Sequence, residues 1–130
     1  MITPTTQRVE GYPFGECVRA AYATLLSLPI EAVPRFDPAA LRKGETQRDR
    51  ERRWLASQGL RLVEIISDDE SKMDAVLGAM PEIYHLMSGV SPRGLFHRCV
   101  GFGGELAFDP HPSRAGLLNV YSVGLLVPQC

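Results

Sequence analysis

Apolar residues first fall into a regular pattern just after a glycine- and proline-containing loop at residues 11–15. From Cys17 to Leu28 they occupy positions 18, 21, 22, 25, 26 and 28, which is the spacing of one face of an α-helix. Pro29 lacks an amide hydrogen and cannot continue that helix. The pattern predicts a buried helix that begins at Cys17 and ends before Pro29, followed by one further turn at residues 30–34.

A second helix is predicted at residues 47–58, after a charged loop at residues 35–46. It ends at Gly59, a residue type that commonly terminates helices. We expect Trp54 and Leu55 to form its inward face. The charged residues of the run QRDRERR are interpreted as a solvated helix face with pairs four residues apart.

The second half of the chain has the alternating, β-branched pattern of strands. Residues 67–70 have the composition of a helix N-cap with an acidic first turn, and they open a short predicted helix that ends at Met80. A two-residue hairpin turn is predicted at Gly103 and Gly104. The predicted strands are residues 60–66, 83–89, 97–102, 105–109 and 119–127. The fold class is therefore α+β, a single domain over residues 1–130 with helices on one face of an antiparallel sheet.

Composition narrows the class of protein. The chain has 130 residues, 45% hydrophobic and 22% charged, with a net charge of −1, as is ordinary for one globular domain. This balance gives little support for nucleic-acid binding. There is no signal-peptide pattern and no apolar run near the ~20 residues that span a membrane. We expect a cytoplasmic protein, in a bacterium or in the host cell of a phage, and the oligomeric state stays open.

Cys17 is the first candidate for chemistry. The three cysteines, Cys17, Cys99 and Cys130, are odd in number and widely spaced, which is a poor disulfide framework. A helix N-terminus carries roughly +0.5 of an elementary charge, so a thiolate at Cys17 is expected to be stabilised. The alternative is a buried cysteine that serves only as a small apolar side chain.

His97 and Asp109 form the second candidate. They lie on the two strands of the predicted hairpin, at the end away from the turn. With a regular two-residue turn, His97 faces a residue near position 110, so Asp109 is one position off and needs a β-bulge or the strand end to share the face of His97. A carboxylate there would orient the imidazole of a nucleophile's base. The alternative is a strand-end histidine and a turn aspartate before Pro110.

Two stretches of the chain resemble a group of small bacterial and tailed-phage proteins. They are GECVRAAYATLLSLPIEAVPRF at residues 15–36, and SGVSPRG with HRCVGFGGELAFDPHPSRAGL at residues 88–117. That group resembles a branch of the papain-like cysteine peptidase superfamily, which has the chain order cysteine, histidine, aspartate. The resemblance implies a papain-like fold and a catalytic triad of Cys17, His97 and Asp109. The group usually has asparagine where this chain has Glu16.

Other residues are assigned supporting roles. The resemblance implies an oxyanion-binding glutamine before the cysteine, and Gln7 is the glutamine that precedes Cys17. Ser88 and His111 are expected to border the substrate. A zinc site is disfavoured because the histidines and cysteines lack a closely paired motif such as CxxC or HExxH.

The resulting hypothesis is a cysteine hydrolase, similar to peptidases and amidases, that needs no cofactor. It would cleave an amide, isopeptide or thioester bond in a peptide or protein substrate. Acyl transfer to an amine shares the same nucleophile chemistry and stays open. The alternative is a catalytically inactive papain-like fold that binds a protein or peptide, and Glu16 beside the cysteine favours that alternative.

Overall fold

The computed structural model describes residues 2–10 and 16–129, so the predicted loop at 11–15 and Cys130 lie outside the described residues. Its helices are α1 (Cys17–Leu26), α2 (Gln47–Ser57) and α3 (Glu70–Gly78), with 3-10 turns η1 (Ile30–Ala32) and η2 (Pro38–Ala40). Its strands are β1 (Leu60–Ile66), β2 (Tyr84–Val90), β3 (Phe96–Phe102), β4 (Glu105–Phe108) and β5 (Ser122–Pro128). These strands form one antiparallel sheet in the order β1-β5-β2-β3-β4. The predicted α+β class, with an N-terminal helix on an antiparallel sheet, is confirmed.

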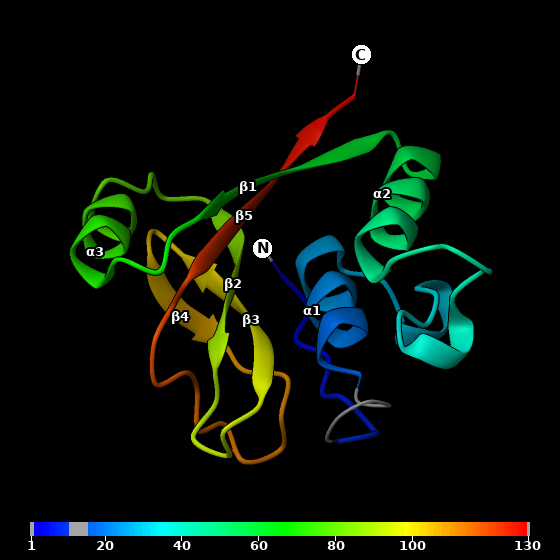
Figure 1. Ribbon diagram of the computed structural model, residues 1–130, viewed down its shortest axis with the longest axis horizontal. Coiled ribbons are helices and arrows are strands. Elements are labelled where there is room, and N and C mark those ends of the chain that lie inside the picture. The colour runs from blue at the N-terminus through cyan, green and yellow to red at the C-terminus, as the bar shows by residue number, and fades with distance from the viewer. Residues whose placement is uncertain (1, 11–15, 130) are drawn as a thin grey trace.

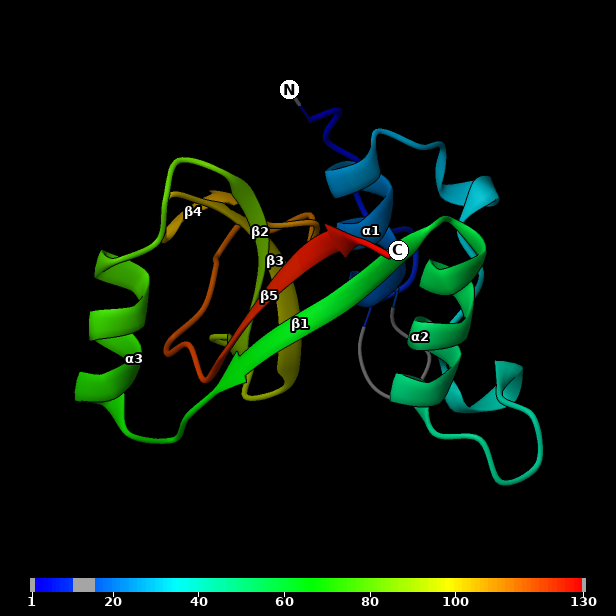
Figure 2. The same cartoon turned by 90° about the horizontal axis from the view of Figure 1, so that it is seen from above.

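The helices cover both sides of the sheet, not one as predicted. Figures 1 and 2 show α1 and α2 on one side and α3 on the other. On the face toward α1, Leu86 of β2 and Val100 of β3 are buried together with Tyr22 of α1. The opposite face carries Met87 and its cross-strand neighbours Cys99 and Val123, all buried. A sheet that is apolar on both faces needs cover on both, which explains the position of α3.

Most predicted element boundaries agree with the structure to within three residues. α2 begins after Thr46, which forms a capping box with Asp49, and ends before Gly59, which has a φ of +73°. α3 is capped by Asp69, which lies within the predicted stretch at residues 67–70, and Glu70 is the acidic residue of its first turn. β5 begins three residues later than predicted, at Ser122. None of the helices in the described part of the chain has the length and apolar character needed to cross a membrane.

The predicted turn between β3 and β4 is present. Gly103 and Gly104 both have positive φ values, 60° and 86°, and Phe102 pairs with Glu105 across the turn. Such values at both central residues suit a two-residue hairpin and favour glycine. A Cβ atom on Gly104 would lie 2.0 Å from the carbonyl oxygen of Leu77, so α3 packs directly against this turn.

Candidate active site

Cys17 is the first residue of α1, and α1 packs against β3. The Cys17 side chain is half-buried and lines a pocket of about 410 Å³. His97, His111 and Gln7 line the same pocket. The structure therefore places the predicted nucleophile at the start of a buried helix, as expected, in the wall of the pocket that the predicted base also lines.

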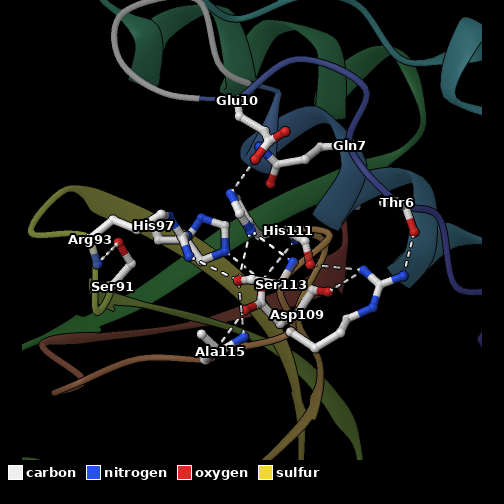
Figure 3. A network of polar contacts seen from close by, with 12 residues as sticks. Thr6, Gln7, Glu10, Ser91, Arg93, His97, Asp109, His111, Ser113 and Ala115 are labelled. Carbon is white, nitrogen blue, oxygen red and sulfur yellow. Dashed lines mark hydrogen bonds and ion pairs between the residues drawn. The ribbon is translucent and has the colours of Figure 1, made fainter.

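His97 and Asp109 are in direct contact. The Nε2 atom of His97 lies 2.5 Å from Oδ1 of Asp109, and both side chains are buried (Figure 3). Asp109 also accepts hydrogen bonds from the backbone N–H groups of His111, at 2.8 Å, and Gly116, at 2.7 Å. Burial acts to raise the pKa of Asp109, but these hydrogen bonds outweigh it and hold the pKa below its ordinary value. Asp109 is thus a fixed carboxylate.

A β-bulge brings the two residues to one face of the sheet. Near the turn, Gly101 pairs with Leu106, but Val100 pairs with Phe108, so Ala107 is an extra residue on β4. The shift turns Asp109 onto the face of His97. Without it, side-chain alternation would point Asp109 to the opposite face. The expectation that a bulge or the strand end restores the required facing is met by the bulge.

The contact with Asp109 decides which nitrogen of His97 is free to act. Nε2 is engaged by the carboxylate, which leaves Nδ1 without a hydrogen-bond partner among residues 2–10 and 16–129. Burial lowers the pKa of His97 below its ordinary value, although Asp109 acts to raise it. At neutral pH the imidazole is therefore uncharged, with a proton on Nε2 and a lone pair on Nδ1.

Burial also raises the pKa of the Cys17 thiol, because a buried thiolate loses hydration. Hydrogen bonding by the Arg98 backbone and the positive charge of the Arg98 side chain oppose this rise without cancelling it. The predicted stabilisation of a thiolate by the helix N-terminus is therefore outweighed. The resting site holds a neutral thiol and a neutral imidazole.

Glu16 does not face the thiol as an unpaired charge. Its carboxylate forms ion pairs with Arg8, at 3.0 Å, and Arg19, at 2.9 Å, and accepts hydrogen bonds from the backbone of Arg8 and Val9. Burial acts to raise the pKa of Glu16, but the bonds from Arg8 and Arg19 lower it to about 2. Glu16 therefore holds the segment at residues 7–10 against the start of α1.

Gln7 belongs to that segment and reaches the pocket. Its backbone N–H donates to the Pro110 carbonyl at 2.9 Å, and its side-chain Nε2 donates to the Val9 carbonyl at 3.0 Å. The Gln7 side chain is buried, and its Oε1 atom has no hydrogen-bond partner in the described part of the protein. A buried polar atom without a partner at a pocket is a position where a ligand can supply the missing bond.

His111 borders the pocket as predicted, and Ser88 does not. The Nε2 atom of His111 lies 2.7 Å from Glu10, its ring centroid is 6.0 Å from that of His97, and its Nδ1 accepts from the Ser113 backbone (Figure 3). Ser88 is buried and accepts a hydrogen bond from Arg98 at 3.2 Å, and it is not among the residues that line the pocket. Ser88 pairs with Arg98 across β2 and β3, so its side chain points to the face away from His97.

A buried ion pair behind Cys17 is not apparent from the sequence pattern. Arg98 donates to Glu51 at 2.6 Å, and Glu51 also accepts from Tyr22 at 2.6 Å and Gln47 at 2.9 Å. The interpretation of all charges in α2 as a solvated face is therefore wrong for Glu51, which is fully buried. The sequence feature that indicates burial of Glu51 is its spacing, because Glu51 lies one helical turn before the inward residue Leu55.

One cluster has the residue types of a metal site. It consists of three buried residues, and each contributes one possible ligand atom. These atoms, from His97, Cys99 and Asp109, lie within 4.8 Å of one another. The Asp109 oxygens already accept from His97, His111 and Gly116. A metal ion would have to displace the contact between His97 and Asp109, so this donor set fits a hydrogen-bonded pair better than a metal.

Comparison with protein-family models, with curated proteins and with solved structures found no match for this chain.

Proposed function

We propose that the protein is a papain-like cysteine hydrolase, with Cys17 as nucleophile, His97 as base and Asp109 as the residue that orients the base. The observation that carries this proposal is the 2.5 Å contact between His97 Nε2 and Asp109. It leaves Nδ1 of His97 as the basic nitrogen in a pocket that Cys17 also lines. A nucleophile, a base and a third group that orients the base are the parts that covalent catalysis requires.

The reaction begins with proton transfer from the Cys17 thiol to His97 Nδ1, as the sulfur attacks the substrate carbonyl carbon. The tetrahedral intermediate collapses to a thioester on Cys17 when the leaving group takes that proton from His97. Water then attacks the thioester, gives its proton to His97 and releases the acid, and the proton returns to the thiol. Because the resting pair is neutral, His97 acts as a general base during attack.

The developing oxyanion needs hydrogen-bond donors next to Cys17. The Cys17 backbone N–H, at the first turn of α1, has no carbonyl partner within its own helix. The Gln7 amide carries a second hydrogen beside the one given to Val9. These two groups are the proposed oxyanion donors.

The class of substrate is an amide, isopeptide or thioester of a peptide or protein. The three bonds share the same first step, so the site alone does not rank them. A volume of about 410 Å³ lies within the usual range for small-molecule pockets, roughly 300–1,000 Å³, and is sufficient for a few side chains of a peptide. The proposed cycle needs no cofactor.

The proposal is tested by labelling with a peptide vinyl sulfone, an electrophile that a cysteine hydrolase attacks at its nucleophile. We expect intact-mass and peptide-mapping analysis to place one adduct on Cys17, faster than on Cys99. The labelling rate should fall only at pH values below the ordinary histidine range of about 6.5, because burial lowers the pKa of His97 and only protonated His97 cannot accept the thiol proton. Cys17 should be labelled more slowly in the variants H97A and D109N, and the labelling rate of H97A should no longer show the fall at low pH that is caused by His97.

C99A removes the neighbouring thiol and should still give the adduct on Cys17, which excludes labelling by way of Cys99. Circular dichroism checks that each variant is folded. If Cys17 reacts no faster in the wild type than in folded H97A, the hydrolase proposal fails. The pocket would then be better explained as a peptide-binding site.

A further inference from the structure

Most of the charged side chains that line the Cys17 pocket have an ion-pair partner, either in the pocket wall or just outside it. Arg19 pairs with Glu16, Arg35 with Asp37, Arg48 with Glu64, and Arg98 with Glu51. Arg93 also lines the pocket, and no carboxylate lies within ion-pair distance of it in the described part of the chain. Arg93 is therefore an exposed cation at the pocket without a carboxylate partner in the described residues, and its guanidinium suits a bound anion.

Arg93 is held in place beside His97. It lies in the tight loop between β2 and β3, where Ser91 N–H donates to the Leu95 carbonyl at 2.9 Å and Gly94 N–H donates to the Ser91 carbonyl at 2.8 Å. Its guanidinium donates to the Ser113 hydroxyl at 3.1 Å, and that hydroxyl lies 2.8 Å from Nδ1 of His111. Figure 3 shows Arg93 next to His97 in this network.

The side of the pocket on which Arg93 lies decides which part of a substrate it meets. In the proposed reaction His97 gives a proton to the leaving group, so the leaving group must contact His97. A cation beside His97 therefore faces the leaving group and not the acyl group. A guanidinium at that position would bind a carboxylate that the leaving amine carries.

The acyl side has a different character. α1 lies between β3 and the segment at residues 35–41 (Figures 1 and 2), and that segment places Phe36 and Leu41 in the pocket wall. Phe36 is buried against Tyr22, with ring centroids 5.7 Å apart. Arg35 and Asp37 of the same segment neutralise each other in an ion pair, so the apolar surface of Phe36 and Leu41 favours an apolar side chain on the acyl residue.

We propose that Arg93 binds a carboxylate on the leaving group, so the preferred substrates are peptides with an apolar residue before the scissile bond and a carboxylate on the residue after it. The inference rests on the proposed function. The carboxylate can be a peptide C-terminus or an acidic side chain. Both present the same planar carboxylate, and its two oxygens can accept two parallel hydrogen bonds from the guanidinium.

The test uses three probes: N-acetyl-Phe-Ala with a free carboxylate, its C-terminal amide, and N-acetyl-Phe-Asp amide. Binding is measured with the C17A variant by calorimetry, and cleavage with the wild type by mass spectrometry. We expect the free acid to bind about 2- to 5-fold more tightly than its amide, the usual effect of an ion pair with an exposed arginine. R93Q should remove this difference, and R93K should keep part of it. R61Q, which changes an exposed arginine of β1 outside the pocket, should keep all of it.

The outcomes separate this inference from the proposed function. The inference is supported if either carboxylate probe binds more tightly than the amide and this difference depends on Arg93, whether or not the wild type cleaves the probe. The carboxylate probe that binds more tightly identifies the source of the carboxylate. Equal binding of all three probes, or a preference that survives in folded R93Q, overturns it. Absence of cleavage together with absence of vinyl sulfone labelling overturns the hydrolase proposal alone.

Discussion

At the scale of single residues, the site depends on which charges are paired and which are not. Glu16 next to the nucleophile suggests repulsion of a thiolate, yet its carboxylate is bound by Arg8 and Arg19. Its backbone N–H also donates to the Val9 carbonyl at 3.0 Å. Glu16 is therefore a positioning residue for the segment that carries Gln7.

This role predicts the effect of E16Q. The neutral amide would bind the two arginines less strongly and loosen residues 7–10. Vinyl sulfone labelling of Cys17 should therefore slow. Iodoacetamide alkylation needs no oxyanion donor, so its rate should stay unchanged across pH. The comparison separates positioning from electrostatics. A faster alkylation in E16Q near neutral pH would show instead that the Glu16 charge opposes the thiolate. R35Q, which breaks a more distant ion pair of the pocket wall, is the matched control.

The sequence predicted the positions of Cys17, His97 and Asp109 because each depends on local features, namely a helix start and a hairpin. Ser88 was assigned to the wrong role because the two faces of β2 are both buried, so its direction could not be inferred from burial. The lack of a carboxylate partner for Arg93 could not be predicted, because an unpaired charge is recognised only when the partners of the other charges are known.

At the scale of elements, the β-bulge at Ala107 is the feature that makes the pair of His97 and Asp109 possible. β4 is a short edge strand, so its register can change with little loss of buried area. The bulge acts through the alternation of side chains and not through any contact of Ala107 itself, which is exposed. A change at Ala107 should therefore alter the geometry of the site with little effect on the stability of the sheet.

Deletion of Ala107 should continue the regular pairing from the turn and rotate Asp109 to the other face. We expect the protein to remain folded by circular dichroism, with vinyl sulfone labelling of Cys17 reduced to the level of D109N. A107G keeps the residue count and should behave as wild type. Wild-type labelling in the deletion variant would show that Asp109 is not what orients His97.

The order and type of the elements followed from periodicity and turn residues, whereas their placement did not. α3 was predicted on the same face as α1 because its own pattern gives no direction, with only Met73 buried among its residues. The need to cover Met87, Cys99 and Val123 appears only after the strands are paired. Placement is thus a property of the assembled sheet.

At the scale of the whole molecule, distant segments are joined through buried polar groups. Arg98 and Glu51 are 47 residues apart, and their contact joins β3 to α2 in the wall of the pocket. Breaking a buried ion pair typically costs about 3–5 kcal/mol, because the remaining charge is left uncompensated. No local pattern predicts such a pair, since each partner resembles an ordinary surface charge in sequence.

Buried histidines link the stability of the whole fold to pH. His85 accepts a hydrogen bond from the Gly104 N–H at Nε2, at 3.0 Å, so its proton is on Nδ1, which donates to the Leu86 carbonyl at 3.1 Å. Burial lowers the pKa of His85, and burial likewise lowers the pKa of His97. Both side chains are therefore neutral in the folded protein at pH values where the unfolded chain already begins to bind protons.

The sign of the effect follows from this difference. The unfolded chain binds protons at these histidines near pH 6.5, while the folded protein does so only at lower pH, so acid favours unfolding. The free energy of unfolding should be constant above about pH 7.5. It should then fall below about pH 6.5, by up to about 1.4 kcal/mol per pH unit for each histidine, until the folded pKa values are passed. Urea titrations from pH 7.5 to 5 measure this slope, and H97A, which removes one of the two groups, should roughly halve it. A slope that is unchanged in H97A would mean that His97 binds its proton at the same pH in the folded and the unfolded protein, and the conclusion that burial lowers its pKa would then be wrong.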